Sequence, residues 1–454
     1  MLKYRYIKRI SLTSGVIYLI ILLVLFQGIR LKRYMRNEVI NHDVVSYYAY
    51  LPAAVIYHDL SFSFVPELPP DFTGRIWTFT SPNGRQTLKM PLGVSLLLLP
   101  FFLIAHVIAL VFGFPADGYS PVYQFFILVA AVFYLTGGLL YLRKTLRLWF
   151  SEIVISITLV LTVLATNLMY YTSVEPGMSH IYGFFLFSGF LWHTLRWFDT
   201  ADCKQAVILG LFAGLILVVR PSDVVVFLVP VLYGIIKYRN KWGRFLWENR
   251  NKLLMMTGMM LIPVLLQLFF WKYSTGRWIF YSYGEEHFYF NHPHILQGLF
   301  SYRKGWLVYT PVMFFALAGF IFLYKKSTQL FWPVLIYFLL NLYVVFSWWC
   351  WWYGGSYGAR SLIETYALLA LPLAAFVERV AGSKTFIRIP VYLVFLFFIY
   401  LNMFQMRQYR ITLLHWDSTS KQLYWKVFLR NRWPDNYKKL LDPPDYKIAL
   451  QKGK

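Results

Sequence analysis

The stretch LGVSLLLLPFFLIAHVIALVFG, residues 92–113, runs for 22 residues without a single Asp, Glu, Lys or Arg. An apolar run of about 18 residues or more is long enough to cross a lipid bilayer as a helix. We therefore predict that the chain folds as an all-α polytopic membrane protein with about 11 to 12 transmembrane helices. Their expected positions are 10–29, 92–113, 121–142, 151–170, 178–197, 205–219, 221–237, 253–271, 305–324, 330–349, 361–380 and 387–403.

The composition of the 454-residue chain agrees with this class. Apolar residues make up 58% of the sequence, aromatic residues 20% and charged residues only 14%. A soluble domain carries roughly a quarter charged residues, so the composition excludes the water-soluble globular, fibrous and disordered classes. No internal repeat or soluble catalytic domain is visible. Any chemistry must therefore be carried by loops and helix ends.

The basic residues indicate membrane orientation rather than nucleic-acid binding. The formal net charge is +24, but Lys and Arg lie mainly between the apolar runs and form no basic domain. We therefore expect no nucleic-acid partner. Under the positive-inside rule, the cluster before the first run keeps the N-terminus in the cytoplasm and exports residues 30–90. That cluster consists of Lys3, Arg5, Lys8 and Arg9.

The same rule creates one conflict near the third run. It puts the basic cluster that begins at Arg143 in the cytoplasm. If the two apolar runs just before this cluster both crossed the membrane fully, the cluster would lie on the outer side instead. We therefore expect 92–113 or 121–142 to be re-entrant or tilted, which requires protein or water to shield its backbone. On this topology residues 1–403 form one transmembrane catalytic domain, and residues 404–454 form a basic C-terminal tail on the outer side.

The outer loop of residues 30–90 opens with NHDVVSYYAYLP, residues 41–52, and we expect it to hold short interfacial helices. Asp43 lies at the rim of the bilayer. An acid in partly desolvated surroundings can serve as a general base near neutral pH, because burial raises the pKa of a carboxyl group. The alternative is a solvated acid or a helix cap. At the far end of the loop, Lys89 before Pro91 either meets a lipid phosphate or simply snorkels at a helix end.

These elements resemble the GT-C superfamily of integral membrane glycosyltransferases, and within it the protein O-mannosyltransferases and the lipid A aminoarabinose transferases. The similarity rests on a first helix, a long outer loop that opens with Asp43 before a Tyr-rich stretch, and a Lys-x-Pro-Leu entry at Lys89. The resemblance implies that Asp43 is the catalytic base or orients the acceptor, and that Lys89 holds the donor phosphate. Tyr47 and Tyr48 are expected to contact substrate. Many members carry an Asp-Glu pair where this chain has Asp43 followed by Val44.

Two further outer loops offer polar side chains. Glu175 could assist Asp43 in positioning the acceptor, and His180 could donate to a phosphate or a sugar hydroxyl, although a lone His at a helix start is more often structural. Arg220 interrupts an apolar stretch and needs a partner. It either pairs with Asp223 across the turn or faces an anionic donor, whose phosphate oxygens suit a planar guanidinium.

The remaining candidates lie between residues 303 and 360. Arg303 and Lys304 at a helix entrance either hold a phosphate or anchor the helix at the interface. The segment WWCWWYGGSYGAR, residues 348–360, combines an aromatic belt with a Gly-rich turn that can bring backbone close to a ligand. A similar Trp-rich, Gly-rich, Arg-terminated stretch occurs in bacterial GT-C proteins. The residues of this segment that we expect to contact the donor are Trp351, Trp352 and Arg360.

Together these residues predict a glycosyltransferase that moves a sugar from a polyprenyl-phosphate donor to an acceptor, with inversion and with Asp43 as the base. We expect a multi-pass protein of the cell inner (cytoplasmic) membrane with a periplasmic active site, surrounded by membrane lipids. The acceptor is a cell envelope glycan, a lipid or a protein. We expect no cofactor and no metal site, and a role for a divalent cation stays open.

The alternatives are a transporter or flippase and a polymerase or ligase, each for a lipid-linked glycan. The prediction of an enzyme requires Asp43, Lys89 and Arg360 to line one lipid-accessible hollow.

Overall fold

The structure, a computed structural model, describes residues 11–68 and 70–453. The basic cluster Lys3, Arg5, Lys8 and Arg9, on which the predicted orientation depends, lies outside the described residues. Seven helical segments of the described chain are long and apolar enough to cross a membrane, which confirms an all-α polytopic membrane protein. They are α1 with the short η1 (Leu12–Arg36), α5 (Gly93–Phe112), α6 (Pro121–Leu146), η3 to α12 (Pro221–Glu248), α13 (Arg250–Thr275), α17 (Thr328–Phe346) and α19 (Thr385–Arg410).

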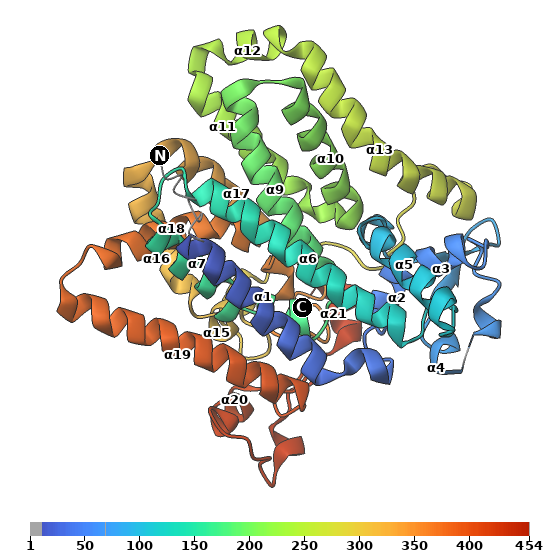
Figure 1. Ribbon diagram of the computed structural model, residues 1–454. Helices are drawn as coiled ribbons and strands as arrows, with labels where there is room; N and C mark the ends of the chain where they lie inside the picture. Colours follow the sequence, from blue (N-terminus) through green and yellow to red (C-terminus); the bar gives the residue numbers. More distant parts are fainter. Residues whose placement is uncertain (1–10, 69, 454) are drawn as a thin grey trace, which may run out of the picture.

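Further helices, and the separate elements of the Pro221–Glu248 span, complete the bundle (Figure 1). They are α7 (Glu152–Leu164), α8 (Leu168–Ser173), α9 (Ser179–Thr200), α10 (Cys203–Val219), η3 (Pro221–Phe227), α11 (Leu228–Tyr238), η4 (Arg239–Lys241), α12 (Trp242–Glu248), α14 (Ile295–Phe300), α15 (Trp306–Tyr309), α16 (Met313–Lys326), η5 (Arg360–Leu362), α18 (Tyr366–Ala381), α20 (Lys421–Val427), η6 (Tyr437–Leu440) and α21 (Tyr446–Lys452).

The predicted count of 11 to 12 transmembrane helices compares with seven helical segments that meet these criteria in the described chain, and several of the other apolar runs are broken. The run 305–324 splits into α15 and α16 at Pro311, where proline removes a backbone donor and disfavours helix in the residue before it. The run 151–170 splits into α7 and α8. The carbonyl groups of Leu164 and Thr166 at this break both accept from the Asn402 side-chain amide, at 2.8 Å each. A buried break is tolerated where such partners exist.

The packing of α1, α5 and α6 bears on the conflict between charge and crossings. Gln124 at the start of α6 bonds to the backbone of Val39, beyond the end of α1, while Arg143 near the end of α6 donates to Ser14 at the start of α1. The helices α1 and α6 are thus antiparallel neighbours. Both ends of α5 lie against the loop 30–90, because Tyr50 and Tyr48 donate to Met90 and Gly118 on either side of it. The run 92–113 forms a continuous helix, α5, and which of the runs 92–113 and 121–142 is re-entrant or tilted stays a prediction.

The outer loop contains the short helices that we predicted, together with a β-hairpin that we did not predict. The hairpin strands β1 (Thr78–Thr80) and β2 (Gln86–Leu88) are antiparallel, with Phe79 opposite Thr87. Ser81 in its turn donates to the carbonyl oxygen of Ser274 at the end of α13, at 2.7 Å. The hairpin leads directly into Lys89. The helices of the loop are η1 (Arg33–Arg36), α2 (Asp43–Tyr48), α3 (Tyr50–Val55), η2 (Val65–Glu67) and α4 (Pro70–Thr73).

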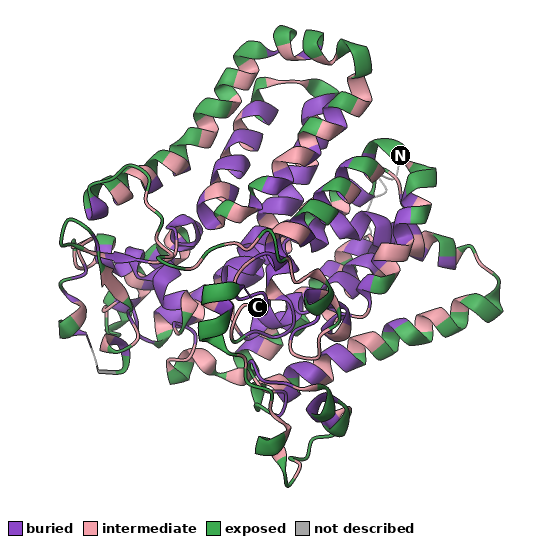
Figure 2. Ribbon diagram, turned by 180° about the vertical axis from the view of Figure 1, so that it is seen from behind, coloured by how far each residue is buried: buried purple, intermediate pink, exposed green. Residues whose placement is uncertain are grey.

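Close helix contacts fix the elements around the site. On α10, Gly210 and Gly214 are four residues apart, and a Cβ atom on either one would clash with a backbone carbonyl of α13. Small residues at this spacing let two membrane helices approach closely. Figure 2 shows the buried core at the centre of the bundle, with α13 and α19 exposed along its edges. In a membrane these two helices face lipid.

The C-terminal segment packs on the bundle. The helix α19 continues to Arg410, so the predicted domain boundary at 403 falls inside a helix. The tail then folds back against the loop that follows α13. Tyr289 of that loop donates to the carbonyl oxygen of Leu450, and His294 bonds to that of Gly453 at 2.6 Å. The tail therefore lies on the same side as the loop between α13 and α15.

Candidate active site

A cavity of about 490 Å³ lies where the outer loop, the start of α9, the end of α10 and the loops after α13 and α17 meet. We call it the aspartate cavity. One part of its wall is apolar and aromatic, with Met90, Pro91, Trp271, Phe280 and Phe288. The other part carries the titratable side chains Asp43, Tyr47, Lys89, His180, Arg220, Tyr281, Tyr283, Glu286, Cys350, Tyr353, Arg360 and Tyr446.

Asp43 is the first residue of α2 and makes an ion pair across the cavity. An Arg360 guanidinium nitrogen donates to Asp43 Oδ2 at 2.8 Å, with about a quarter of the carboxylate side chain exposed, 28%. The other oxygen, Oδ1, makes no hydrogen bond within the described chain. Tyr47 lies one turn later on α2 and donates to Ser179 at the start of α9. Asp43 is thus held by one oxygen and offers the other to a ligand.

Arg360 reaches this position through the Gly-rich turn that we singled out. Gly358 has φ +61°, and an added Cβ would lie 3.1 Å from the Cβ of Tyr309. A residue with a side chain would be strained and crowded there. The preceding Tyr357 donates from its hydroxyl to Asn402, the residue that closes the α7–α8 break. The turn is therefore fixed to the bundle just before Arg360.

Lys89 forms an ion pair with Glu286, a residue of the loop after α13. Trp349 donates from its indole nitrogen to the second Glu286 oxygen at 3.0 Å. The Lys89 carbonyl accepts from Ser282 at 2.5 Å, so both ends of the residue are held. The lysine side chain is still about one third exposed, 36%. This pair lies at the rim of the cavity and is accessible to an anion.

Arg220 ends α10 and belongs to a buried charge cluster. Its guanidinium lies 3.5 Å from Glu364 and 3.9 Å from Asp223, so the predicted pairing with Asp223 is present but is the longer of the two. His180 bonds to the same Glu364 oxygen at 2.8 Å. Two carboxylates therefore surround one buried guanidinium, which also faces the Tyr353 ring at 5.6 Å.

Glu364 is the main site residue that the sequence reasoning missed. It is one of two acids within the apolar run 361–380, the other being Glu378 near its end. An ionisable residue inside such a run is a signal of function in its own right. Tyr283, Tyr353 and Tyr446 were also missed, and they appear in the wall only because distant loops and the tail meet there. Burial raises the pKa of Tyr283 and Tyr446, so both phenols stay protonated hydrogen-bond donors at neutral pH.

Four of the predicted phosphate and substrate contacts lie outside the cavity wall. Tyr48 is fully buried and donates to the Gly118 carbonyl at 2.5 Å. Arg303 pairs with Asp442 of the tail at 3.0 Å. Instead of Trp351 and Trp352, the wall contains the two preceding tryptophans of the belt, Trp348 and Trp349.

Lys304 and Glu175 also lie outside this wall. Lys304 is buried behind the Gly-rich turn, where it donates to the Ser356 carbonyl and faces the Tyr409 ring at 4.9 Å. Burial lowers the pKa of Lys304 to about 7. Glu175 accepts from Tyr170 at 3.0 Å. Both side chains therefore contact other protein groups and do not face the open space of the cavity.

The cavity places one carboxylate oxygen next to three cations and an apolar wall. Lys89, Arg220 and Arg360 can stabilise an anion, and the guanidinium groups offer planar donors that match phosphate oxygens. Asp43 can accept a proton from a hydroxyl group held beside that anion. Among the described residues, no group of three or more His, Cys, Asp or Glu side chains is placed to hold a metal ion.

Comparison with known proteins adds one finding. No family model matches the chain, and no curated protein matches it in sequence. Among solved structures, the chain is similar to the oligosaccharyltransferase of Archaeoglobus fulgidus in its apo form, with a TM-score of 0.51 and 14% sequence identity. The similarity covers 99% of this chain and 60% of that protein. The two chains thus share a fold.

Proposed function

We propose that the protein is a membrane glycosyltransferase that transfers a sugar from a polyprenyl-phosphate donor to an acceptor at the outer, periplasmic face of the cytoplasmic membrane. One observation carries this proposal: Asp43, Lys89, Arg220 and Arg360, from four separate segments, line a single cavity. A fold shared with an oligosaccharyltransferase supports the same class of reaction. The acceptor is a glycan, a lipid or a protein.

The donor would bind with its phosphate at the cations and its lipid chain toward the bilayer. The apolar wall with Trp271, Ile279 and Phe280 offers a surface for the first part of that chain. Exposed apolar side chains of α13, such as Phe269, continue it on the outside of the bundle. A polyprenyl phosphate can therefore reach the cavity sideways from the membrane.

In the transfer step, the acceptor hydroxyl oxygen attacks the anomeric carbon from the face opposite the phosphate. Its proton passes to Asp43 Oδ1, the bond between the anomeric carbon and the phosphate oxygen breaks, and polyprenyl phosphate leaves with the bonding electrons. The configuration at the anomeric carbon is inverted. Lys89, Arg220 and Arg360 stabilise the charge that develops on the departing phosphate. No step in this sequence is assigned to a metal.

The test is sugar release from a radiolabelled polyprenyl-phosphate sugar by the purified protein in proteoliposomes with membrane acceptors. Asp43→Asn keeps the shape and a hydrogen-bond partner for Arg360 but removes the base, so we expect transfer to fall by about 10²- to 10⁴-fold. Asp71→Asn is the matched control, because Asp71 is an exposed acid of the same outer loop. We expect this control to transfer sugar at the wild-type rate.

Three outcomes would overturn the proposal. Sugar transfer by Asp43→Asn at the wild-type rate would show that this carboxylate is not the base. Movement of the intact donor across the bilayer without bond cleavage would show a transporter or flippase. Use of a lipid diphosphate oligosaccharide in place of the monophosphate sugar would identify a polymerase or ligase.

A further inference from the structure

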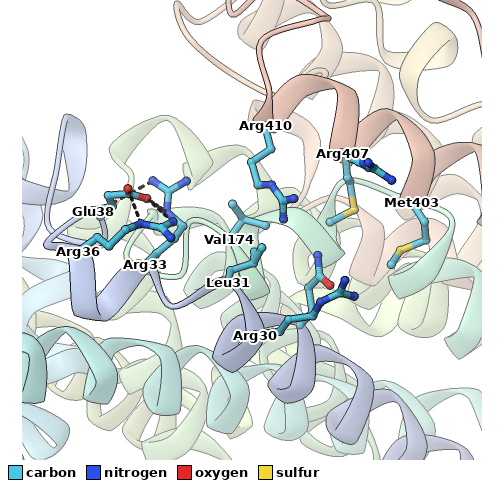
Figure 3. Close-up of a pocket in the computed structure, with 11 residues that line it drawn as sticks. Arg30, Leu31, Arg33, Arg36, Glu38, Val174, Met403, Arg407 and Arg410 are labelled. Carbon is cyan, nitrogen blue, oxygen red and sulfur yellow. Dashed lines mark hydrogen bonds and ion pairs between the residues drawn. The ribbon is translucent and has the colours of Figure 1, made fainter. Parts of the chain in front are cut away.

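A second hollow of about 730 Å³ lies between the outer ends of α1 and α19. We call it the arginine pocket. Figure 3 shows its wall, in which Arg30 and the residues of η1 come from one side and Arg407 and Arg410 from the other. Its charged residues are Arg30, Arg33, Arg36, Arg407, Arg410 and the single acid Glu38. The pocket therefore has a large excess of positive charge.

The one carboxylate neutralises only part of this charge. Arg36 binds Glu38 through two nitrogens, at 2.8 and 3.1 Å, and Arg33 lies 3.6 Å from the same carboxylate. Arg30, Arg407 and Arg410 make no ion pair within the described chain. Arginine keeps its charge at any physiological pH, so these like charges cannot be relieved by losing a proton. An anion from outside is needed to balance them.

The surroundings of the pocket indicate what carries that anion. On the membrane side of the arginines, α1 exposes Phe26 and Ile29, and α19 exposes Phe397 and Tyr400. Both helices are apolar enough to span a bilayer. Cations at the ends of lipid-facing helices lie at the level of the phosphate groups of lipids. A ligand with a phosphate and an apolar anchor would contact both surfaces at once.

We propose that the arginine pocket binds the phosphate-bearing headgroup of an anionic membrane lipid, whose chains lie along α1 and α19. The unpaired Arg30, Arg407 and Arg410 donate to the phosphate oxygens, for which guanidinium groups are well suited. This binding site does not depend on the proposed transfer reaction, since it shares no lining residue with the aspartate cavity.

The two sites are nevertheless neighbours. Val174 lines the arginine pocket, and the nearby Met178 lines the aspartate cavity. In the outer loop, Glu38 lines the arginine pocket and Asp43 lines the aspartate cavity. Two short pieces of chain thus form the wall between them. A lipid in the arginine pocket would lie beside the wall of the reaction site without entering it.

The experiment measures lipid binding directly, in nanodiscs of phosphatidylcholine with titrated spin-labelled phosphatidylglycerol. The test variant is the triple substitution Arg30→Gln, Arg407→Gln and Arg410→Gln. Each cation near a membrane surface contributes about a factor of five, so we expect roughly a hundredfold weaker binding of the labelled lipid. The matched control removes three cations at the other end of α19, where α18 ends and α19 begins. We expect this control to bind the labelled lipid like the wild type. These cations are Arg379, Lys384 and Arg388.

Several results would overturn the proposal. Equal losses in the test and control variants would show only diffuse attraction between charges. Binding of inorganic pyrophosphate to the wild type in detergent as tightly as the lipid, with the same loss in the test variant, would assign the pocket to free phosphate compounds. If the triple variant unfolds in a thermal melt, the single variant Arg407→Gln decides: about a fivefold loss supports the lipid site and no loss refutes it.

Discussion

The aspartate cavity and the arginine pocket both gather cations at helix ends, but they differ in how those cations are paired. In the aspartate cavity Lys89, Arg220 and Arg360 each have a carboxylate within 4 Å. In the arginine pocket Arg30, Arg407 and Arg410 have none in the described chain. These cations are thus paired with carboxylates in the first site and unpaired in the second.

The difference indicates two different tasks. A cation already held by a carboxylate is fixed in position before the ligand arrives, which suits a site that must stabilise charge in a transition state. A cation without a partner gains most of its stabilisation from the ligand itself, which suits a site that only binds. The four predictions below test this contrast, from the largest expected effect to the smallest.

The largest effect is expected on stability. Arg220→Met leaves Glu364 and Asp223 buried without their cation, so we expect the free energy of unfolding in detergent to fall by about 3 to 5 kcal/mol. Arg410→Met in the arginine pocket removes an exposed charge among like charges, and we expect a change within about 0.5 kcal/mol. Equal losses in chemical unfolding would contradict the contrast between the two sites.

The next effect concerns the rate of sugar transfer. Arg360→Gln removes the guanidinium that holds Asp43 and that would face the phosphate of the proposed donor. We therefore expect kcat to fall by about 10²- to 10³-fold. Arg360→Lys restores a charge without the planar fork and should recover only part of the rate. Arg277→Gln, an exposed arginine of the loop after α13, serves as the control. Binding of phosphatidylglycerol by Arg360→Gln should match the wild type.

A smaller effect depends on pH through Lys304. Burial lowers the pKa of this lysine from 10.5 to about 7, so between these values the unfolded chain binds more protons than the folded one. Stability therefore rises with pH in this window, by at most about 1.4 kcal/mol per pH unit. Thermal melts from pH 7 to 10 should show this rise, and Lys304→Met should remove the contribution. A melting temperature that falls with pH equally in both proteins would contradict it.

The charged groups that act on Lys304 are Asp417, Arg360, Glu175 and Arg303. The arginine pocket has no group that titrates between pH 7 and 10, since its cations are all arginines and its one acid is a glutamate. Binding of phosphatidylglycerol should stay constant over the same window. A change in that binding parallel to the melts would link the two regions.

The smallest effect is expected at the rim of the aspartate cavity. Glu286→Gln keeps an acceptor for the Trp349 indole but removes the negative charge next to Lys89. Because the pair is partly exposed, we expect a change of no more than about 1 kcal/mol, seen as a donor KM up to about fivefold lower with kcat unchanged. A higher KM would show that Glu286 itself helps to bind the donor. Glu285→Gln next to it is the matched control.

The sequence predicts the position of the central site residues well, and the reason is partition into the membrane. Asp43, Lys89, Arg220 and Arg360 each lie where an apolar run meets a polar segment. Such junctions gather at the membrane faces whatever the details of packing, so four of them can be assigned to one face without coordinates. Their meeting in one cavity needs the structure.

The sequence misplaces other candidate residues for a different reason. Which tryptophans of the belt point into the cavity depends on the backbone of the Gly-rich turn, and Tyr353, Gly354 and Gly358 there all have positive φ. The partner of Arg303 is Asp442, which reaches it only because the tail folds back. Local patterns carry no information on either.

The arginine pocket was overlooked because its members look ordinary one at a time. An arginine at the end of an apolar run, such as Arg30 or Arg410, is the usual sign of a helix end at the interface. Only the structure shows that the ends of the first and last runs line one pocket. The separation in sequence is what hides the charge cluster.

The ion pair between Asp43 and Arg360 joins residues that are 317 positions apart. At a translation speed of about 5 to 20 residues per second, Asp43 emerges roughly 15 to 60 seconds before its partner is made. During that interval a nascent chain already inserted in the membrane carries the carboxylate but no assembled site. The proposed transfer reaction is thus withheld until synthesis has nearly reached the last helices, and under that proposal an incompletely made copy cannot act on lipid-linked sugars around it.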